Sequence, residues 1–428
     1  TLMIAHNAQF DACFLRGLLR GQKVGRIDWL DSLTVYKDRR AYPHKLANAI
    51  IAYDLTDKVQ NSHRAIDDVL ALFEVLKAMD DEREDLGSYV NLFGYNPKYG
   101  VSGRRIVEMV KENLTVSKII TPDSVRNAIR VLMACGGSTN MLIHLKAIMG
   151  RAGFDIDLME FDAISNDTPL LVNVKPHGTN PVGAEFHNAG GVPAVMKELE
   201  GKLNLDCMTV TGKTVGENLK KVDYAYDRRV IRSIDAPISP VGGMCILKGN
   251  LAPNGAVIKR SAATERLLHH RGRAKVFDDL SVAEKWLADE NSDVDENTVI
   301  VLRGYGPKGA PGMPEMAILA STIAAAGLRK SAALITDGRF SGVTTGAVIG
   351  HVSPEAALGG PIGLVQDGDI IEYDTIEGYI NLLVSEEELE KRRAEWKPLP
   401  PRVTTGYLAK YASMVGTASH GARVVAKL

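Results

Sequence analysis

Short apolar runs that alternate with glycine and proline turns are the feature that most constrains the fold of this chain. Between residue 232 and the C-terminus these runs occupy residues 299–303, 332–336, 362–365 and 370–373. Apolar runs of this length between turn residues are typical of buried strands. The dipeptide Asp367-Gly368, between the last two runs, predicts a β-hairpin. Ser385 and Glu388 predict a capped helix over residues 385–396. The pattern predicts an α/β region followed by a barrel-like β domain.

Residues 1–105 have a different pattern. Residues 2–5 form a short apolar strand that reads as the end of a longer element, so we expect further chain before it. Residues 29–35 predict a second strand, and residues 63–79 predict the clearest helix. The stretch 91–103 is rich in Gly, Asn and Pro, which predicts a loop and a boundary between residues 1–105 and 106–428. The apolar face of the predicted helix consists of residues at helical spacing: Ile66, Val69, Leu70, Phe73, Leu76 and Met79.

Charge and cysteine content exclude several classes of protein. The 428 residues carry 51 Lys and Arg against 52 Asp and Glu, which excludes a globally basic nucleic-acid-binding protein. A hydrophobic fraction of 45% supplies buried cores and excludes disorder as the main state. No apolar run reaches the ~18–20 residues that a membrane span needs. The cysteines at 13, 135, 207 and 245 form no C-x-x-C pair. This excludes a disulfide scaffold and a zinc ribbon, and we expect a reducing, cytoplasmic compartment.

Two short motifs in residues 1–105 combine acids with histidine. HNAQFD (6–11) ends in Asp11, and HRAIDD (63–68) contains His63 and Asp68. Hydrolysis of a phosphodiester by two Mg²⁺ ions needs carboxylates to hold the metals and a base to deprotonate water. Histidine suits the second role because it titrates near neutral pH. Each motif alone favours ordinary turn and helix-start residues, but the two together are more specific.

Together these motifs resemble those of the DEDD-type 3′–5′ exonucleases, whose fold is ribonuclease-H-like. The resemblance implies that Asp11 and Asp68 are Mg²⁺ ligands and that His63 is the general base. It allows a nucleic-acid partner for residues 1–105 alone. The first motif of that family, an Asp-x-Glu on the opening strand, is not in this sequence. We therefore interpret residues 1–105 as a partial exonuclease segment and expect no appreciable exonuclease activity.

Two glycine-rich loops in residues 106–428 carry the second set of functional groups. The loop GPKGAPGMPE (306–315) ends in Glu315, and TDGRFSG (336–342) places Ser341 between glycines. Glycine allows a ligand to approach the backbone closely. Glu315 is interpreted either as a helix N-terminal residue, which the helix dipole favours, or as an oxygen ligand for a hard cation. Ser341 is interpreted either as a turn residue or as a functional hydroxyl.

Residues 106–428, which include these two loops, resemble the dihydroxy-acid dehydratase/phosphogluconate dehydratase family. Long blocks in a fixed order are more specific than any single motif. The matching blocks are GGSTN (136–140), NAGGVPAVMKEL (188–199), TVTGKTVGEN (209–218), LKGNLAP (247–253), GPKGAPGMPEM (306–316), TDGRFSG (336–342) and GHVSPEAALGGPIGLVQDGDII (350–371).

The resemblance implies dehydration of a small-molecule 2,3-dihydroxy acid to a 2-keto acid, most like the enzyme of branched-chain amino-acid biosynthesis. An aldonic (sugar) acid dehydratase of the same family is the alternative, because residues 175–191 depart from the common pattern. Ser341 would be the base that removes the C2 proton, and Glu315 would be an Mg²⁺ ligand. A neighbouring cation stabilises an alkoxide, which would make serine a usable base. Arg339 would hold a substrate carboxylate or, equally, clamp the loop to the backbone.

The family also uses an iron–sulfur cluster as Lewis acid for the departing hydroxyl. Its cysteine ligands belong to an N-terminal half, and none of the cysteines of this chain lies in a cluster-ligand motif. We interpret them as small buried apolar residues.

The expected fold class is α/β in three parts. Residues 1–105 are the truncated exonuclease-like segment, residues 106–225 are the tail of the dehydratase N-terminal α/β domain, and residues 226–428 are its swivelling β-barrel domain. The intact family is expected to form homodimers or tetramers. Three hypotheses remain: a truncated and fused dehydratase, a nuclease with a dehydratase-like passenger, and a non-catalytic chimera. The share of the chain that resembles the dehydratase family favours the first hypothesis. Because the metal-ligand sets of both sites are incomplete, we expect this chain alone to be inactive.

Overall fold

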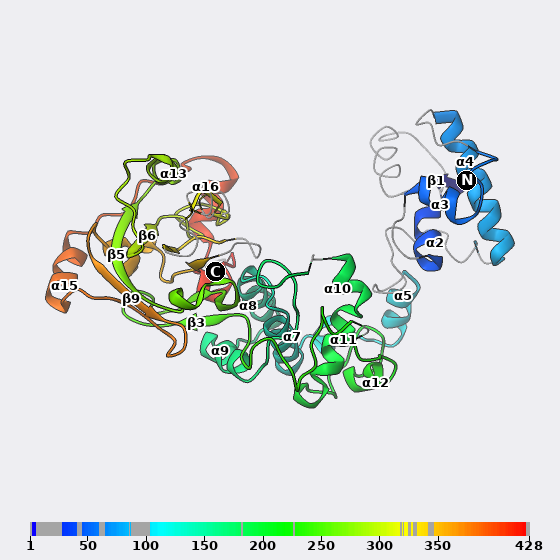
Figure 1. Ribbon diagram of the computed structural model, residues 1–428, viewed down its shortest axis with the longest axis horizontal. Helices are drawn as coiled ribbons and strands as arrows, with labels where there is room; N and C mark the ends of the chain where they lie inside the picture. Colours follow the sequence, from blue (N-terminus) through cyan, green and yellow to red (C-terminus); the bar gives the residue numbers. More distant parts are fainter. Residues whose placement is uncertain are drawn as a thin grey trace. The chain divides into compact units, whose positions relative to one another are not determined.

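The computed structural model describes residues 2–5, 28–40, 45–59, 65–84, 86, 103–180, 183–225, 227–316, 319, 321–323, 327, 332–340 and 346–424. It divides into two compact units (Figure 1). The first unit comprises residues 1–116 with 209–213, and the second comprises residues 117–208 with 214–428. Within the described residues, no helix is both long enough and apolar enough to cross a membrane.

The first unit pairs two short parallel strands, β1 (Leu2–Ala5) and β2 (Asp28–Asp31), and its described residues also include four α-helices. The predicted strand over residues 2–5 is confirmed. The strand predicted over residues 29–35 is wrong beyond Asp31, because the Asp31 carboxylate caps a helix there. It accepts hydrogen bonds from Leu33 N (3.1 Å) and Thr34 Oγ1 (2.9 Å). The helices are α2 (Ser32–Arg39), α3 (Leu46–Ala52), α4 (Ala65–Glu82) and α5 (Gly103–Lys111).

Helix α4 confirms the predicted helix but only part of its predicted apolar face. Val69 and Phe73 are each 63% exposed. Leu76 and Met79 are buried as predicted, and Ala71 and Val75 are buried with them. Helix α4 carries apolar residues on more than one face, so helical spacing alone did not identify the face that packs on α2 and α3.

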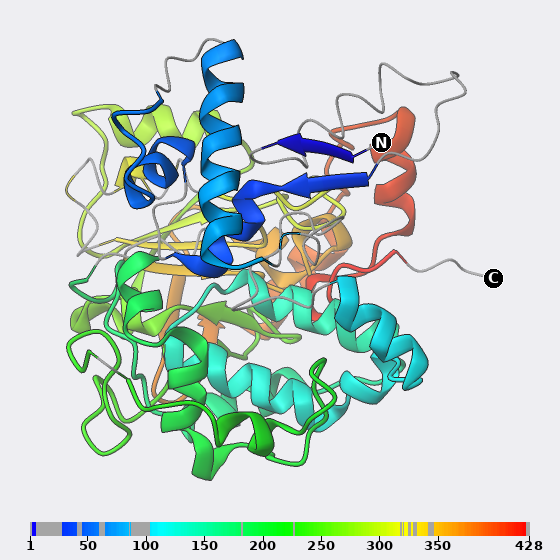
Figure 2. The same ribbon diagram turned by 90° about the vertical axis from the view of Figure 1, so that its right-hand side faces the viewer.

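The second unit begins with a layer of helices. Helix α7 (Pro122–Cys135) starts with a capping box between Thr121 and Ser124 and ends at Gly136, which has φ 54°. Helices α7, α8 and α9 lie alongside one side of the sheet (Figures 1 and 2). The other helices of this layer are α6 (Val116–Ile119), α8 (Asn140–Ala152), α9 (Leu158–Asn166), α10 (Ala184–Asn188), α11 (Gly191–Glu198), η2 (Glu200–Lys202) and α12 (Val215–Leu219).

The sheet of the second unit has eight strands in the order β10-β9-β5-β6-β7-β8-β4-β3. Its two edges meet, because Lys248 N donates to Gly378 O (3.0 Å) and Ile380 N donates to Lys248 O (3.3 Å). This contact makes the sheet a nearly closed barrel, as the sequence pattern predicts. The strands are β3 (Cys245–Leu247), β4 (Ala256–Ile258), β5 (His269–Phe277), β6 (Thr298–Leu302), β7 (Ala333–Thr336), β8 (Ala347–Gly350), β9 (Ile370–Asp374) and β10 (Tyr379–Leu382).

The central strands are buried on both faces, which explains why they read as continuous apolar runs. Along β6, Val299 and Val301 belong to the hydrophobic core inside the barrel. Ile300 and Leu302 belong to a second core, between the barrel and the helices that cover it. The outer core is covered by α7, α8, α9 and α13. Besides α13 (Leu280–Ala288), the barrel region carries η3 (Arg260–Ala262), η4 (Glu265–Leu267), η6 (Ala356–Leu358), α16 (Gly406–Met414) and η8 (Ala418–His420).

Two predictions near the C-terminus are corrected and one is confirmed. Residues 362–365 are not a strand, because they form the 3₁₀ helix η7 (Pro361–Leu364). The hairpin therefore joins β9 to β10, and Gly378 (φ 74°) lies in its turn, whereas Asp367-Gly368 only leads into β9. Helix α15 (Glu386–Glu395) is confirmed, with Ser385 Oγ accepting from Glu388 N (3.2 Å).

Candidate functional site

The loops that follow β6, β7 and β8 meet at one end of the barrel. These three strands are parallel neighbours, so their carboxyl ends lie at the same edge of the sheet. Asp337, the first residue after β7, is fully buried there. Its carboxylate accepts hydrogen bonds from Gly304 N (3.0 Å), Tyr305 N (2.8 Å) and Ala356 N (2.9 Å). Burial raises the pKa of Asp337, and these donors partly offset that rise. Asp337 therefore joins the three loops.

Glu355 provides a second junction between the same loops. Its carboxylate accepts from Lys308 N (3.0 Å) and Gly309 N (2.8 Å), in the loop after β6. Burial raises the pKa of Glu355 to about 7. The folded chain therefore holds a proton on this carboxyl more tightly than the unfolded chain does.

This pKa predicts a pH dependence of stability that Glu355→Gln should remove. The folded pKa lies above the ordinary value, so the contribution of Glu355 is greatest below pH 4.5 and falls as the pH rises to about 7. Between pH 4.5 and about 7 the free energy of unfolding should therefore fall by about 3 kcal/mol, because each unit of pKa difference corresponds to about 1.36 kcal/mol. Urea unfolding at several pH values between 4.5 and 8 measures it. Glu290→Gln, at an exposed position, should keep the wild-type profile; equal slopes for wild type and Glu355→Gln would contradict the prediction.

Glu315 and Arg339 lie side by side, one in each of the two glycine-rich loops. They form an isolated parallel β-bridge, in which Met316 N donates to Arg339 O (2.7 Å). The Glu315 side chain is exposed. Glu315 itself lies in this bridge, and residues 317–318 are outside the described residues, so its interpretation as a helix N-terminal residue stays a prediction. Arg339 Nε donates to Met313 O (2.6 Å), which agrees with the loop-clamp interpretation of Arg339.

Asn140 is a residue whose role was not recognised from the sequence. It is the first residue of α8, after the glycine turn of the GGSTN block. Its Nδ2 donates to Glu315 Oε1 at 2.5 Å, although the two residues are 175 positions apart. Within the described part of the chain, Asn140 Oδ1 and Thr139 Oγ1 are buried without hydrogen-bond partners. The GGSTN block was the available signal, but no spacing rule connects it to Glu315.

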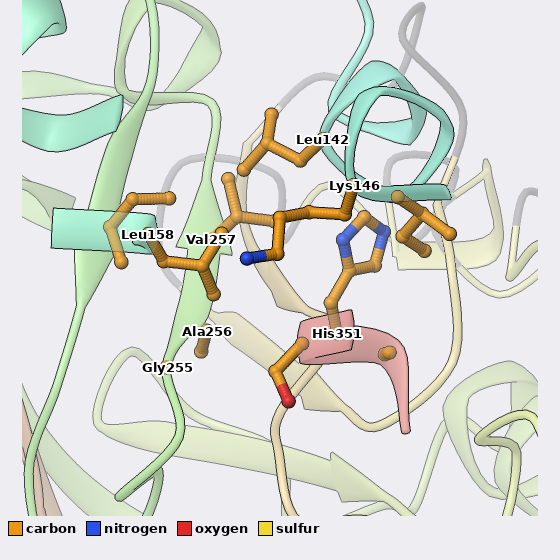
Figure 3. Close-up of a pocket in the computed structure, with 11 residues that line it drawn as sticks. Leu142, Lys146, Leu158, Gly255, Ala256, Val257 and His351 are labelled. Carbon is orange, nitrogen blue, oxygen red and sulfur yellow. The ribbon is translucent and has the colours of Figure 1, made fainter. Parts of the chain in front are cut away.

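A small cavity lies between α8, β4 and the loop after β8 (Figure 3). His351 and Lys146 line it, and Lys146 Nζ is bound to Asp155 Oδ1 (2.5 Å) and Ile156 O (2.9 Å). The volume of about 20 Å³ holds about one water molecule. His351 Nε2 is buried, with no partner among the described residues. Burial lowers the pKa of His351 to about 3, so the ring is neutral. This cavity is too small for an organic acid.

The other predicted site residues are only partly described. Asp11, His63 and Ser341 lie outside the described residues. Asp68 lies in the first turn of α4, where its Oδ1 is buried without a partner among the described residues. A site that combines Asp11, His63 and Asp68 therefore stays a prediction.

The described cysteines do not suit an iron–sulfur cluster. Burial raises the pKa of the Cys135 and Cys245 thiols to about 12, and it also raises the pKa of Cys207. Cluster ligands are thiolates, and the three described cysteines form no C-x-x-C pair or other cluster-ligand motif. Cys13 lies outside the described residues. The oxygen atoms of Glu315 and Asn140, in contrast, are of the type that Mg²⁺ prefers.

Comparison with known proteins agrees with the family resemblance that the sequence blocks indicated. Residues 98–218 match the model of the dihydroxy-acid/6-phosphogluconate dehydratase N-terminal domain, and residues 229–422 match that of the C-terminal domain. Over these residues the chain belongs to the dihydroxy-acid/6-phosphogluconate dehydratase family. Neither family model extends over residues 1–97. The exonuclease resemblance of that segment receives no support from the comparisons.

Curated relatives carry the name dihydroxy-acid dehydratase. A protein of Methanococcoides burtonii is 51% identical over 324 residues, which are 75% of this chain and 58% of that protein. Proteins of Acetivibrio thermocellus and Ignicoccus hospitalis are 49% and 50% identical over 323 residues, with the same coverage of 75% and 58%. The chain thus spans less than two thirds of the length of these relatives.

Proposed function

We propose that residues 106–428 form the C-terminal part of a hydro-lyase that converts a 2,3-dihydroxy acid to a 2-keto acid. The observation that carries this proposal is the placement of Glu315 beside Arg339, with Asn140 bound to Glu315, inside the segments that match the dehydratase family. The relatives are named dihydroxy-acid dehydratase, and we propose a branched-chain dihydroxy acid rather than an aldonic acid as the substrate. The proposed domains are residues 106–225 and 226–428.

The reaction removes a proton from C2 and hydroxide from C3, and the resulting enol tautomerises to the keto acid. We assign the removal of the C2 proton to Ser341, in the loop that begins at Asp337. Glu315 would hold Mg²⁺, which supplies positive charge for oxyanions when it is bound. The terminal nitrogens of Arg339 are assigned to the substrate carboxylate, while its Nε stays on Met313 O. No step is assigned to an iron–sulfur cluster, because the described thiols do not fit one.

A graft tests this proposal. We would join residues 106–428 to the N-terminal portion of the Methanococcoides burtonii relative and reconstitute the product anaerobically with iron, sulfide and Mg²⁺. Release of 2-keto acid from 2,3-dihydroxyisovalerate, measured as the dinitrophenylhydrazone, is expected, with slower release from aldonic acids. Ser341→Ala should reduce turnover at least about 100-fold, because general-base catalysis contributes about 10²–10⁴-fold. A folded graft that contains its cluster and yet is inactive on every dihydroxy acid would refute the assignment.

A further inference from the structure

The contact between Asn140 and Glu315 joins two segments that are remote in the sequence. Asn140 belongs to the helical layer, and Glu315 belongs to a loop at the end of the barrel. An amide and a carboxylate can meet favourably in one orientation only, because the amide oxygen would repel the carboxylate. The amide nitrogen therefore faces Glu315 Oε1. In this orientation Asn140 Oδ1 takes no part in the contact with Glu315.

Asn140 Oδ1 is a buried acceptor with no donor among the described residues. Leaving such a group unpaired costs about 1–3 kcal/mol, so native structures seldom retain one without a reason. An uncharged oxygen beside a carboxylate is able to ligate a hard cation or to accept from water bound to that cation. Its neighbour Thr139 Oγ1 is also unpaired within the described part of the chain, so the unsatisfied polar atoms concentrate at this turn.

We propose that Asn140 is a positioning residue that orients the Glu315 carboxylate for a divalent cation. The amide N–H holds one carboxylate oxygen, so the other oxygen and Asn140 Oδ1 present two acceptors to the same cation. This inference rests on the proposed role of Glu315 and adds Asn140, from the helical layer, to the site. It explains why a residue of the GGSTN block contacts a loop that is 175 residues away.

The test is Mn²⁺ binding by the full chain, followed by electron paramagnetic resonance of the free ion and by competition with Mg²⁺. We expect one site that is lost on Glu315→Gln. Asn140→Leu should weaken it about 10-fold or more, because mutation of orienting partners costs 10–100-fold in metal affinity. Asn140→Asp should recover the affinity by adding a carboxylate ligand. Asn188→Asp, at the exposed end of α10, is the matched control and should leave binding unchanged.

A second measurement distinguishes positioning from a purely structural role. For Asn140→Leu, which loses the N–H donor that orients Glu315, Mg²⁺ should raise the Tm less than it raises the Tm of wild type, because weaker binding stabilises the folded state less. A structural role would give the same Tm shift for both. The proposal is overturned if the chain has no Mn²⁺ site that depends on Glu315, or if Asn140→Leu binds Mn²⁺ as tightly as wild type. Neither result decides the dehydratase assignment, which turnover of the graft tests separately.

Discussion

Replacing Asp337 with alanine is expected to reduce the free energy of unfolding of the full chain by at least about 3 kcal/mol, since each of three buried donors left without an acceptor costs about 1–3 kcal/mol. Three backbone N–H groups, of Gly304, Tyr305 and Ala356, would lose their acceptor at once. The loops after β6, β7 and β8 would then lose the group that joins them. Urea unfolding followed by circular dichroism measures the change.

Two further variants sharpen this prediction. Asp337→Asn retains one oxygen acceptor but turns an NH₂ group towards a backbone donor, so we expect an intermediate loss of stability. Asp289→Ala removes a carboxylate at the exposed C-cap of α13 and should change the free energy of unfolding by less than about 0.5 kcal/mol. If Asp337→Ala is as stable as Asp289→Ala, Asp337 does not join the loops.

Replacing Glu315 with glutamine is expected to lower turnover of the grafted enzyme at least about 100-fold, because losing a direct ligand should exceed the 10–100-fold cost of losing an orienting partner. Glutamine keeps the size of the side chain and an oxygen for Asn140 Nδ2, but it removes the negative charge that a cation needs. The deficit should shrink as the Mg²⁺ concentration is raised, which is measured as a higher Mg²⁺ requirement at saturating substrate.

Glu377→Gln is the matched control for this prediction. Glu377 is exposed in the turn between β9 and β10, and its loss should leave turnover and the Mg²⁺ requirement unchanged. Wild-type turnover of Glu315→Gln at the same Mg²⁺ concentration would show that Glu315 is not a ligand.

The barrel strands were predictable because their residues repeat a local pattern. Residues 299–302 and 333–335 are all apolar, and both faces of the strands that contain them are buried. The N-cap of α15 was also predictable, because Ser385 and Glu388 act within one helical turn. Residues 362–365 were misjudged, because an apolar run of four residues has no period that distinguishes a strand from a 3₁₀ helix.

The sequence by itself determined the two glycine-rich loops, the family over residues 106–428, and most strands of the barrel, because these properties depend on residues close together in the chain. Only the tertiary structure decided that Asp337 and Glu355 join the loops and that Asn140 contacts Glu315. Those contacts depend on the parallel order of β6, β7 and β8 and on the packing of α8 beside the barrel. Hydrogen bonds between residues 175 positions apart follow from how elements pack, and no local pattern encodes them.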